Sequence, residues 1–144
     1  MLTTLLYGSE SWVTYSHHIR ILERFHQRCL RTILQLKWWD YVSDITVLER
    51  SKQTSIEALL LKRRLRWAGH VSRMKNNRLP KMVLFGELIE GHRNIGLPLK
   101  RFKDQLKCSL SNIDVPQEAW TELASDRATW RATVHHAASQ FEKN

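Results

Sequence analysis

Histidine and cysteine are the first side chains to consider for chemistry, because both bind transition metals. The 144-residue chain has seven histidines and two cysteines. Two histidine pairs, at 17–18 and 135–136, are adjacent, and neighbours on a helix point about 100° apart, unlike the i, i+4 pair that binds a metal. Cys29 and Cys108 lie far apart and do not have zinc-finger spacing. The residue types therefore predict no metal, no cofactor and two free thiols.

The acidic residues and the nucleophile motifs give no sign of catalysis. The sequence lacks a glycine-rich phosphate loop, a G-x-S-x-G motif and an H-E-x-x-H motif. Its 14 acidic residues are scattered, and no adjacent aspartates point to two-metal phosphoryl transfer. Carboxylates that are distant in the sequence and meet only in the folded protein would leave no such motif. We expect that the chain is not an enzyme by itself.

The basic residues are concentrated in the middle of the chain. The formal net charge is +9, of which residues 51–110 carry +10, residues 1–50 carry +1 and residues 111–144 carry −2. Such asymmetry favours a polyanionic partner, RNA or DNA, over a basic face that is merely solvated. Three groups at helical or loop spacing could bind phosphates. The candidates are Arg20, Arg24, Arg28 and Arg31, then Lys62, Arg66 and Arg73, and finally Arg93, Lys100, Arg101 and Lys103.

Six tryptophans are many for this length. Trp38 and Trp39 interrupt the helical pattern, and Tyr41 follows them. They could form a stacking platform for bases, as in proteins that bind single strands, but we favour the interpretation that they anchor a helix junction in the core. The other four fit apolar helix faces and are expected in the core: Trp12, Trp67, Trp120 and Trp130.

Helices must position these side chains. Apolar residues at i, i+3 and i+4 predict helices over 17–36, 44–50, 55–74, 80–88, 98–111, 116–124 and 126–140. Residues 2–13 form either a strand and turn or an irregular lead-in. The sequence thus predicts an all-α bundle of about five to seven helices with a short irregular or extended N-terminal lead-in.

Helix starts and faces follow from the same pattern. Predicted capping boxes begin at Thr46, with Asp44 as an earlier start, and at Thr54, and Ser16 is a candidate N-cap. Gly69 interrupts the basic stripe of helix 55–74, so either a foreign backbone approaches there or another helix packs tightly. The arginines of helix 17–36 lie opposite its apolar face. That face consists of Ile19, Leu22, Phe25, Cys29, Ile33 and Leu36.

The organisation along the chain is simple. Residues 1–75 are interpreted as one helical segment and residues 76–144 as a basic loop and C-terminal helical segment, unless the two pack as one domain. No apolar run approaches the roughly 20 residues of a membrane span, and the start lacks the features of a signal peptide. We expect a protein of the cell interior, nuclear or cytoplasmic, that is not secreted.

Several ordered motifs resemble one protein family. They are TLLYGSESW at 4–12, RCLR at 28–31, WD at 39–40, VLER at 47–50, RLRWAGHV-x-RM at 64–74, G-x-R-x-x-G-x-P-x-x-RF-x-D at 91–104 and DR-x-x-WR at 126–131. This series resembles the segment after the palm in reverse transcriptases of non-LTR (LINE-type) retrotransposons, especially the RTE-like group. Three positions depart from the family's usual residues: Ser9 replaces Cys, Leu97 replaces Arg and Phe102 replaces Trp.

The resemblance implies the thumb and C-terminal region of an endonuclease and RNA-directed DNA polymerase, whose catalytic parts would precede residue 1. In that family the region is thought to hold template RNA and target DNA. The combined prediction is non-catalytic binding of nucleic-acid backbone, with the polymerase palm of a related protein as a second candidate partner. The alternatives are a helical module for protein interaction or self-association, and a retroelement remnant without selected function.

Overall fold

The computed structural model describes residues 2–86 and 100–141, and these residues form helices and turns with no strand. The predicted all-α class is confirmed. The helices are α1 (Leu2–Leu5), α2 (Ser16–Ile33), α3 (Asp44–Ser51), α4 (Ile56–Ser72), α5 (Leu79–Phe85), α6 (Phe102–Ser111), α7 (Trp120–Ser125) and α8 (Arg127–Phe141), with 3-10 turns η1 (Ser9–Ser11) and η2 (Trp38–Asp40). Within the described ranges there are eight α-helices, because the lead-in contains the single-turn helix α1.

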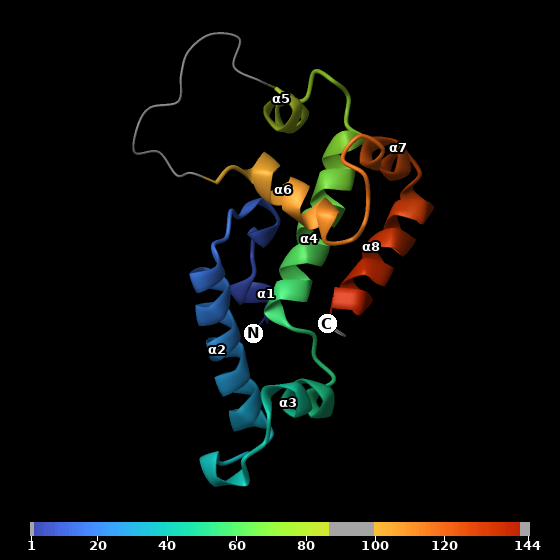
Figure 1. Ribbon diagram of the computed structural model, residues 1–144. Helices are drawn as coiled ribbons and strands as arrows, with labels where there is room; N and C mark the ends of the chain where they lie inside the picture. Colours follow the sequence, from blue (N-terminus) through green and yellow to red (C-terminus); the bar gives the residue numbers. More distant parts are fainter. Residues whose placement is uncertain (1, 87–99, 142–144) are drawn as a thin grey trace.

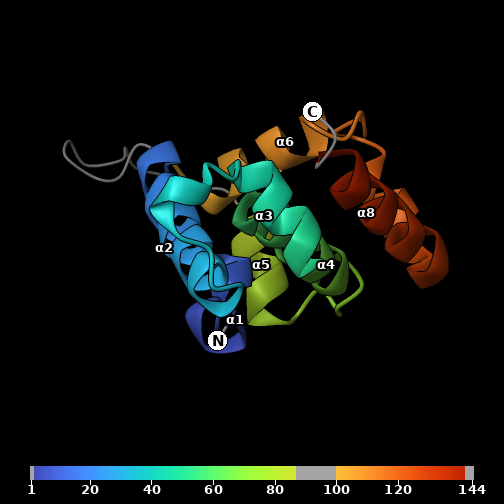
Figure 2. The same cartoon turned by 90° about the horizontal axis from the view of Figure 1, so that it is seen from below.

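Helix α4 is the centre of the molecule (Figure 1). It contacts α2, η1 and α5, and also α6, α7 and α8, so the two halves of the sequence meet on it. Seen from below, α2 and α8 lie on opposite sides of α4 (Figure 2). Nine of its 17 residues are buried. A helix that is apolar around most of its circumference is stable only when other helices cover it, which explains this central position.

Two apolar clusters hold the helices on α4. The larger joins its middle and C-terminal part, including Leu65 and Val71, to α6, α7 and α8, and contains Trp120 and Trp130. The smaller joins the start of α4 to the lead-in, where Leu6 is fully buried. Of the four tryptophans expected in the core, Trp120 and Trp130 are buried, whereas Trp12 and Trp67 are partly buried and pack at the edges of the clusters.

Gly69 is the point where α4 and α8 approach most tightly. A Cβ atom on Gly69 would lie only 2.1 Å from Nε1 of Trp130. The same indole N–H donates to the carbonyl oxygen of Leu65 at 3.0 Å. Of the two interpretations of this glycine, the structure therefore supports tight packing of another helix, with a tryptophan side chain as the neighbour.

Helix α3 begins at Asp44 as predicted, but the residues that cap α3 and α4 differ from the predicted ones. Helix α3 is capped by Ser43, whose Oγ accepts from the Thr46 backbone N–H, and α4 by Ser55, whose Oγ accepts from the Ala58 N–H at 3.2 Å. At the start of α4, Thr54 and Ser55 both carry a hydroxyl group at a position that can cap the helix, and tertiary contacts determine which of them does so. Here Glu23 of α2 accepts from the Glu57 N–H at 3.1 Å and so occupies the donor next to the Ser55 cap.

The prediction of which residues form the buried face of α2 was partly wrong. Phe25 is 44% and Ile33 70% exposed, whereas the buried side of the helix carries His26, Gln27 and Leu30. The reason is that α2 packs against α3 and α4 with the side that carries His26, Gln27 and Leu30, and this side does not coincide with the centre of the predicted apolar face.

In the described part of the chain, none of the helices is long and apolar enough to cross a membrane.

Candidate nucleic-acid interface

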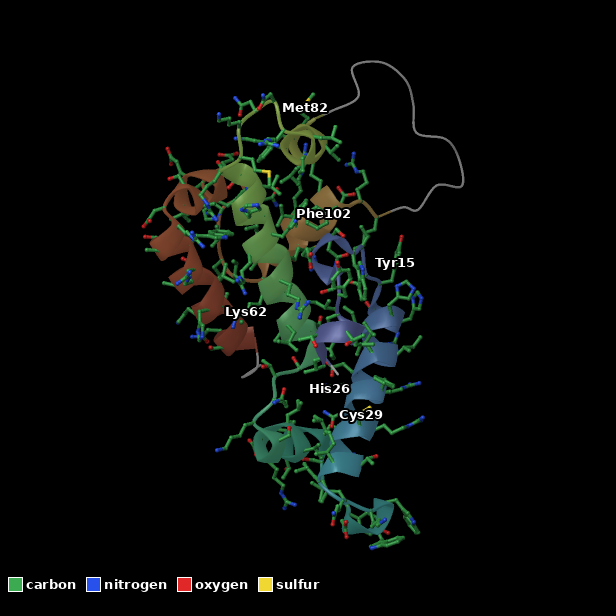
Figure 3. The ribbon with its side chains drawn as sticks, turned by 180° about the vertical axis from the view of Figure 1, so that it is seen from behind. Tyr15, His26, Cys29, Lys62, Met82 and Phe102 are labelled. Carbon is green, nitrogen blue, oxygen red and sulfur yellow. The ribbon has the colours of Figure 1, made fainter. Side chains whose placement is uncertain are left out.

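A groove of about 790 Å³ runs between α4 and α8, and its walls are strongly basic. One wall is the predicted stripe of α4, and Lys62 lies on the side of that helix that faces α8 (Figure 3). The other wall is a row on α8 at i, i+4 and i+8 spacing, which places its members on one face. The basic and imidazole residues of the groove are Lys62, Arg63, Arg66, His70, Arg73, Arg127, Arg131 and His135.

Packing at Gly69 creates this groove. Because Trp130 lies directly against Gly69, the two helices touch along an apolar seam that includes Val134, and the basic residues flank the seam. Trp67 and Trp130 contribute to the lining below the charges. The groove therefore combines a packed apolar floor with a cationic rim.

The cations of the groove differ in their internal partners. Arg63 donates to the Leu6 carbonyl oxygen at 2.6 Å, and Arg73 donates to the Ala124 carbonyl oxygen. Both guanidinium groups thus help to hold the fold while their remaining N–H donors stay available. Among the described residues, the side-chain nitrogens of Lys62, Arg66 and Arg131 have no hydrogen-bond or ion-pair partner.

Acidic compensation in the groove is small. Among the residues that the structure describes, Glu10 is the single carboxylate in its lining. The ion pairs formed within the described ranges join Arg31 to Asp44 and Arg101 to Asp104, and neither lies in the groove. The groove is therefore a region in which the cations outnumber the single carboxylate, as expected where phosphates bind.

The arginines predicted on α2 separate into two roles. Arg20, Arg24 and Arg28 are exposed on α2, and this helix lies on the opposite side of α4 from α8 (Figure 2). Arg31 instead binds within the protein: one nitrogen of its guanidinium lies 2.7 Å from both the Val42 carbonyl oxygen and Oδ1 of Asp44. It fastens the segment before α3 to the end of α2.

The predicted cations around the start of α6 form a separate group that does not line the groove. Arg101 binds Asp104 through two side-chain contacts of 3.1 Å, and this arrangement lowers the pKa of Asp104 to about 2. The ammonium of Lys100 lies 5.8 Å from the centre of the Tyr15 ring. Lys103 is half-buried on α6. Arg93 lies outside the described residues.

Sequence analysis missed two features of this region. The first is the α8 row of Arg127, Arg131 and His135, whose four-residue spacing was visible but whose apposition to α4 depends on tertiary packing. The second is Arg64, which is only 4% exposed. Its guanidinium donates to Oγ of Ser109 at 3.0 Å and to Oγ1 of Thr14 at 3.3 Å.

Arg64 is a structural cross-link. It joins α4 to α6 and to the segment before α2, and burial lowers its pKa without any acidic partner bonded to it. Gln105 completes the network by accepting from the Thr14 backbone N–H at 3.0 Å. The side chain is therefore occupied inside the protein and not directed at a ligand.

The aromatic turn η2 contradicts the favoured sequence interpretation. Trp38 is 78% exposed, Trp39 56% and Tyr41 85%, so these rings do not anchor a helix junction in the core.

Histidine, cysteine and carboxylate groups in the described ranges form no cluster of three or more that could hold a metal ion.

Comparison with known proteins finds similarity to a transposon-derived protein of Caenorhabditis elegans, with 29% identity over 143 residues. The match covers 93% of this chain and 50% of the relative, so the chain spans about half the length of that protein. No protein-family model matches the chain, and no solved structure matches it. The similarity connects the chain to transposon-derived sequences and carries no information on activity.

Proposed function

We propose that this chain binds the sugar-phosphate backbone of RNA or DNA in the groove between α4 and α8, without catalysis of its own. The observation that carries the proposal is the pair of facing basic rows, with Lys62 and Arg66 on α4 and Arg127 and Arg131 on α8, around a single carboxylate. In this proposal the chain corresponds to the thumb and C-terminal region of a LINE-type reverse transcriptase. There it would hold template RNA or target DNA while other parts carry out polymerisation.

Three independent features support this assignment. The positive charge of the chain is concentrated in its middle segment, which includes α4. The sequence motifs resemble the region after the palm of LINE-type enzymes, and the similarity to a transposon-derived protein agrees with a mobile-element origin. Cations that contact phosphates confer affinity with little base preference, which suits a surface that must accept any template sequence.

Binding would follow simple electrostatics. Each phosphate that contacts a lysine or arginine releases condensed counterions, so the affinity falls linearly with salt on logarithmic axes. Removing one such contact should reduce the slope by roughly 0.7 to 0.9. The arginines would supply paired N–H donors to phosphate oxygens, whereas Lys62 would act as a point charge.

The test is fluorescence anisotropy with an RNA hairpin and a DNA duplex across a salt series. The variant Arg66→Ala/Arg131→Ala removes one exposed cation from each wall, and we expect weaker binding and a slope smaller by roughly 1.4 to 1.8. The matched control, Arg50→Ala/Arg78→Ala, removes the same charge from exposed positions outside the groove. Equal affinity and slope for wild type and groove variant would overturn the proposal.

A second candidate function is protein interaction or self-association, for which one observation speaks. Helix α5 exposes Leu79, Met82 and Val83, with exposed fractions of 71%, 55% and 74%. Contiguous exposed apolar side chains often mark contacts between proteins. A sedimentation coefficient that rises with protein concentration, together with no detectable binding of RNA or DNA, would favour this function.

A further inference from the structure

Three large aromatic side chains project from one short turn between α2 and α3. The turn forms the tip of the molecule beyond the end of α2, away from the body formed by α4 and α8 (Figure 1). Trp38, Trp39 and Tyr41 are each more than half exposed. Exposing three large rings forgoes the free energy that their burial would provide, so exposed clusters of this kind usually mark a binding surface.

Hydrogen bonds hold the turn in shape independently of the rings. Oδ2 of Asp40 accepts from the Lys37 backbone N–H at 2.6 Å, which closes the 3-10 turn. Tyr41 adopts a left-handed backbone conformation with φ of 47°, a costly conformation for a residue with a side chain. Arg31 fastens the following residue, Val42, to α2. These bonds hold the backbone from which the rings project.

The two tryptophans meet edge to face, with centroids 5.6 Å apart and ring planes at 76°. An edge-to-face pair covers at most one ring face, so flat aromatic surface remains accessible on both residues. A planar ligand can therefore stack on the turn without first separating the pair.

Exposed cations adjoin the turn along the chain: Lys37 directly precedes Trp38, and Arg28 and Arg24 lie on α2, five and nine residues before its end at Ile33. The guanidinium groups of Arg24 and Arg28 have no hydrogen-bond or ion-pair partner among the described residues. Of the two carboxylates between residues 37 and 44, Asp44 is paired with Arg31, whereas Asp40 accepts from the Lys37 N–H and keeps its negative charge. Aromatic rings next to unpaired cations are the combination that proteins use to bind single-stranded nucleic acid, with bases on the rings and phosphates on the cations.

We propose that η2 is a second nucleic-acid site that stacks unpaired bases of a single strand, with the strand's phosphates on Arg28 and Arg24. The proposal shares the ligand class of the proposed function but uses other residues, on another side of α4. An apolar protein segment is the competing ligand for such rings, and it would have no need of the unpaired arginines.

The experiment compares wild type with Trp38→Ala/Trp39→Ala, which removes exposed rings and leaves both apolar clusters untouched. The matched control is Tyr7→Ala, because Tyr7 is an aromatic residue that is 85% exposed outside the turn. The ligands are oligo(dT), an abasic strand of equal length and a DNA duplex. Binding is followed by anisotropy and by quenching of tryptophan fluorescence, and circular dichroism verifies that each variant is folded.

For oligo(dT) we expect a loss of at least about fivefold in the double variant, since a stacked base contributes roughly 1 to 3 kcal/mol. The abasic strand should bind wild type and variant alike, and duplex affinity should be unchanged. Equal oligo(dT) affinity in wild type and double variant would overturn the stacking site. So would wild-type self-association that the double variant abolishes without any base-dependent binding.

The two proposals can fail separately. Arg66→Ala/Arg131→Ala tests the groove through duplex affinity, whereas the difference between oligo(dT) and the abasic strand tests the turn. If the groove variant binds duplex normally while the tryptophan variant loses base-dependent binding, the groove assignment is wrong and the stacking site stands.

Discussion

At the scale of single residues, the contact between Gly69 and Trp130 decides how closely α4 and α8 approach. The variant Gly69→Ala would place a methyl group 2.1 Å from the indole nitrogen and force Trp130 away from the Leu65 carbonyl. Overpacking of this kind costs about 1 to 3 kcal/mol, and alanine's higher helix propensity returns less than about 1 kcal/mol of it. We expect a net loss of stability in urea unfolding.

A double-mutant cycle tests the cause of that loss. Phenylalanine at position 130 removes the nitrogen that the new methyl group would strike. Gly69→Ala should therefore cost less in the Trp130→Phe background than in wild type. An equal cost in both backgrounds would show that the indole nitrogen is not the cause of the loss, since phenylalanine keeps a ring atom equivalent to Cδ1, which would lie 2.5 Å from the new methyl group.

His26 provides a prediction about pH. Its ring is fully buried, neither ring nitrogen has a partner in the described structure, and burial lowers its pKa from the usual value. The unfolded chain therefore binds the proton more readily, so stability is complete above about pH 6.5 and declines as the pH falls below it. The slope contributed by this group can reach about 1.4 kcal/mol per pH unit.

The measurement is urea unfolding at several pH values between about 5 and 7.5, for wild type and for His26→Leu. The difference in unfolding free energy between the two proteins should shift in favour of the variant as the solution becomes more acidic. The same comparison with His136→Ala, an exposed position, should show a much smaller shift. A difference that stays constant with pH would contradict the assignment to His26.

At the scale of elements, the helix starts give a sharp comparison between sequence and structure. The Thr54 capping box was the sequence prediction, yet Ser55 supplies the cap of α4. Loss of an N-cap hydroxyl costs about 0.5 to 2 kcal/mol. We expect Ser55→Ala to lower the unfolding free energy by about 1 kcal/mol and Thr54→Ala by clearly less. The reverse order in thermal or urea unfolding would restore the sequence assignment.

The helices themselves could be predicted, because their apolar period is a local property of the chain. The side that α2 buries could not, since this depends on where α3 and α4 lie. Sequence periodicity placed Phe25 inside, but the protein buries His26 and leaves Phe25 exposed. The exposure of Trp38 and Trp39 could not be predicted for a similar reason: hydrogen bonds with Asp40 and Arg31 shape that turn, and neither apolar cluster of the described residues includes the two rings.

The candidate site, too, could be predicted from the sequence only in part. The stripe of Lys62, Arg66 and Arg73 follows from helical spacing alone, and the structure places all three in the groove. Its partners on α8 could not be assigned, because residues separated by about sixty positions meet only after Gly69 and Trp130 pack. Periodicity predicts a helix face; only tertiary structure shows that two faces form one groove.

At the scale of the whole molecule, the basic groove should reduce the stability of the free protein. Like charges that face each other across the groove repel, and the chain's net charge of +9 adds to this repulsion. A surface selected for folding alone would intersperse carboxylates among these arginines. An uncompensated groove is consistent with a surface kept for an anionic ligand, at some expense of stability.

We expect Arg66→Ala/Arg131→Ala to be more stable than wild type at low salt, by roughly 0.5 to 1 kcal/mol, since few favourable contacts are lost and repulsion is relieved. Salt screens the repulsion, so the advantage should vanish at high ionic strength. A short polyanion that occupies the groove should stabilise wild type more than the variant. Urea unfolding at low and high salt, with and without polyphosphate, measures all three effects. If the variant is less stable at low salt, these arginines hold the fold and the groove is not a site kept open for a ligand.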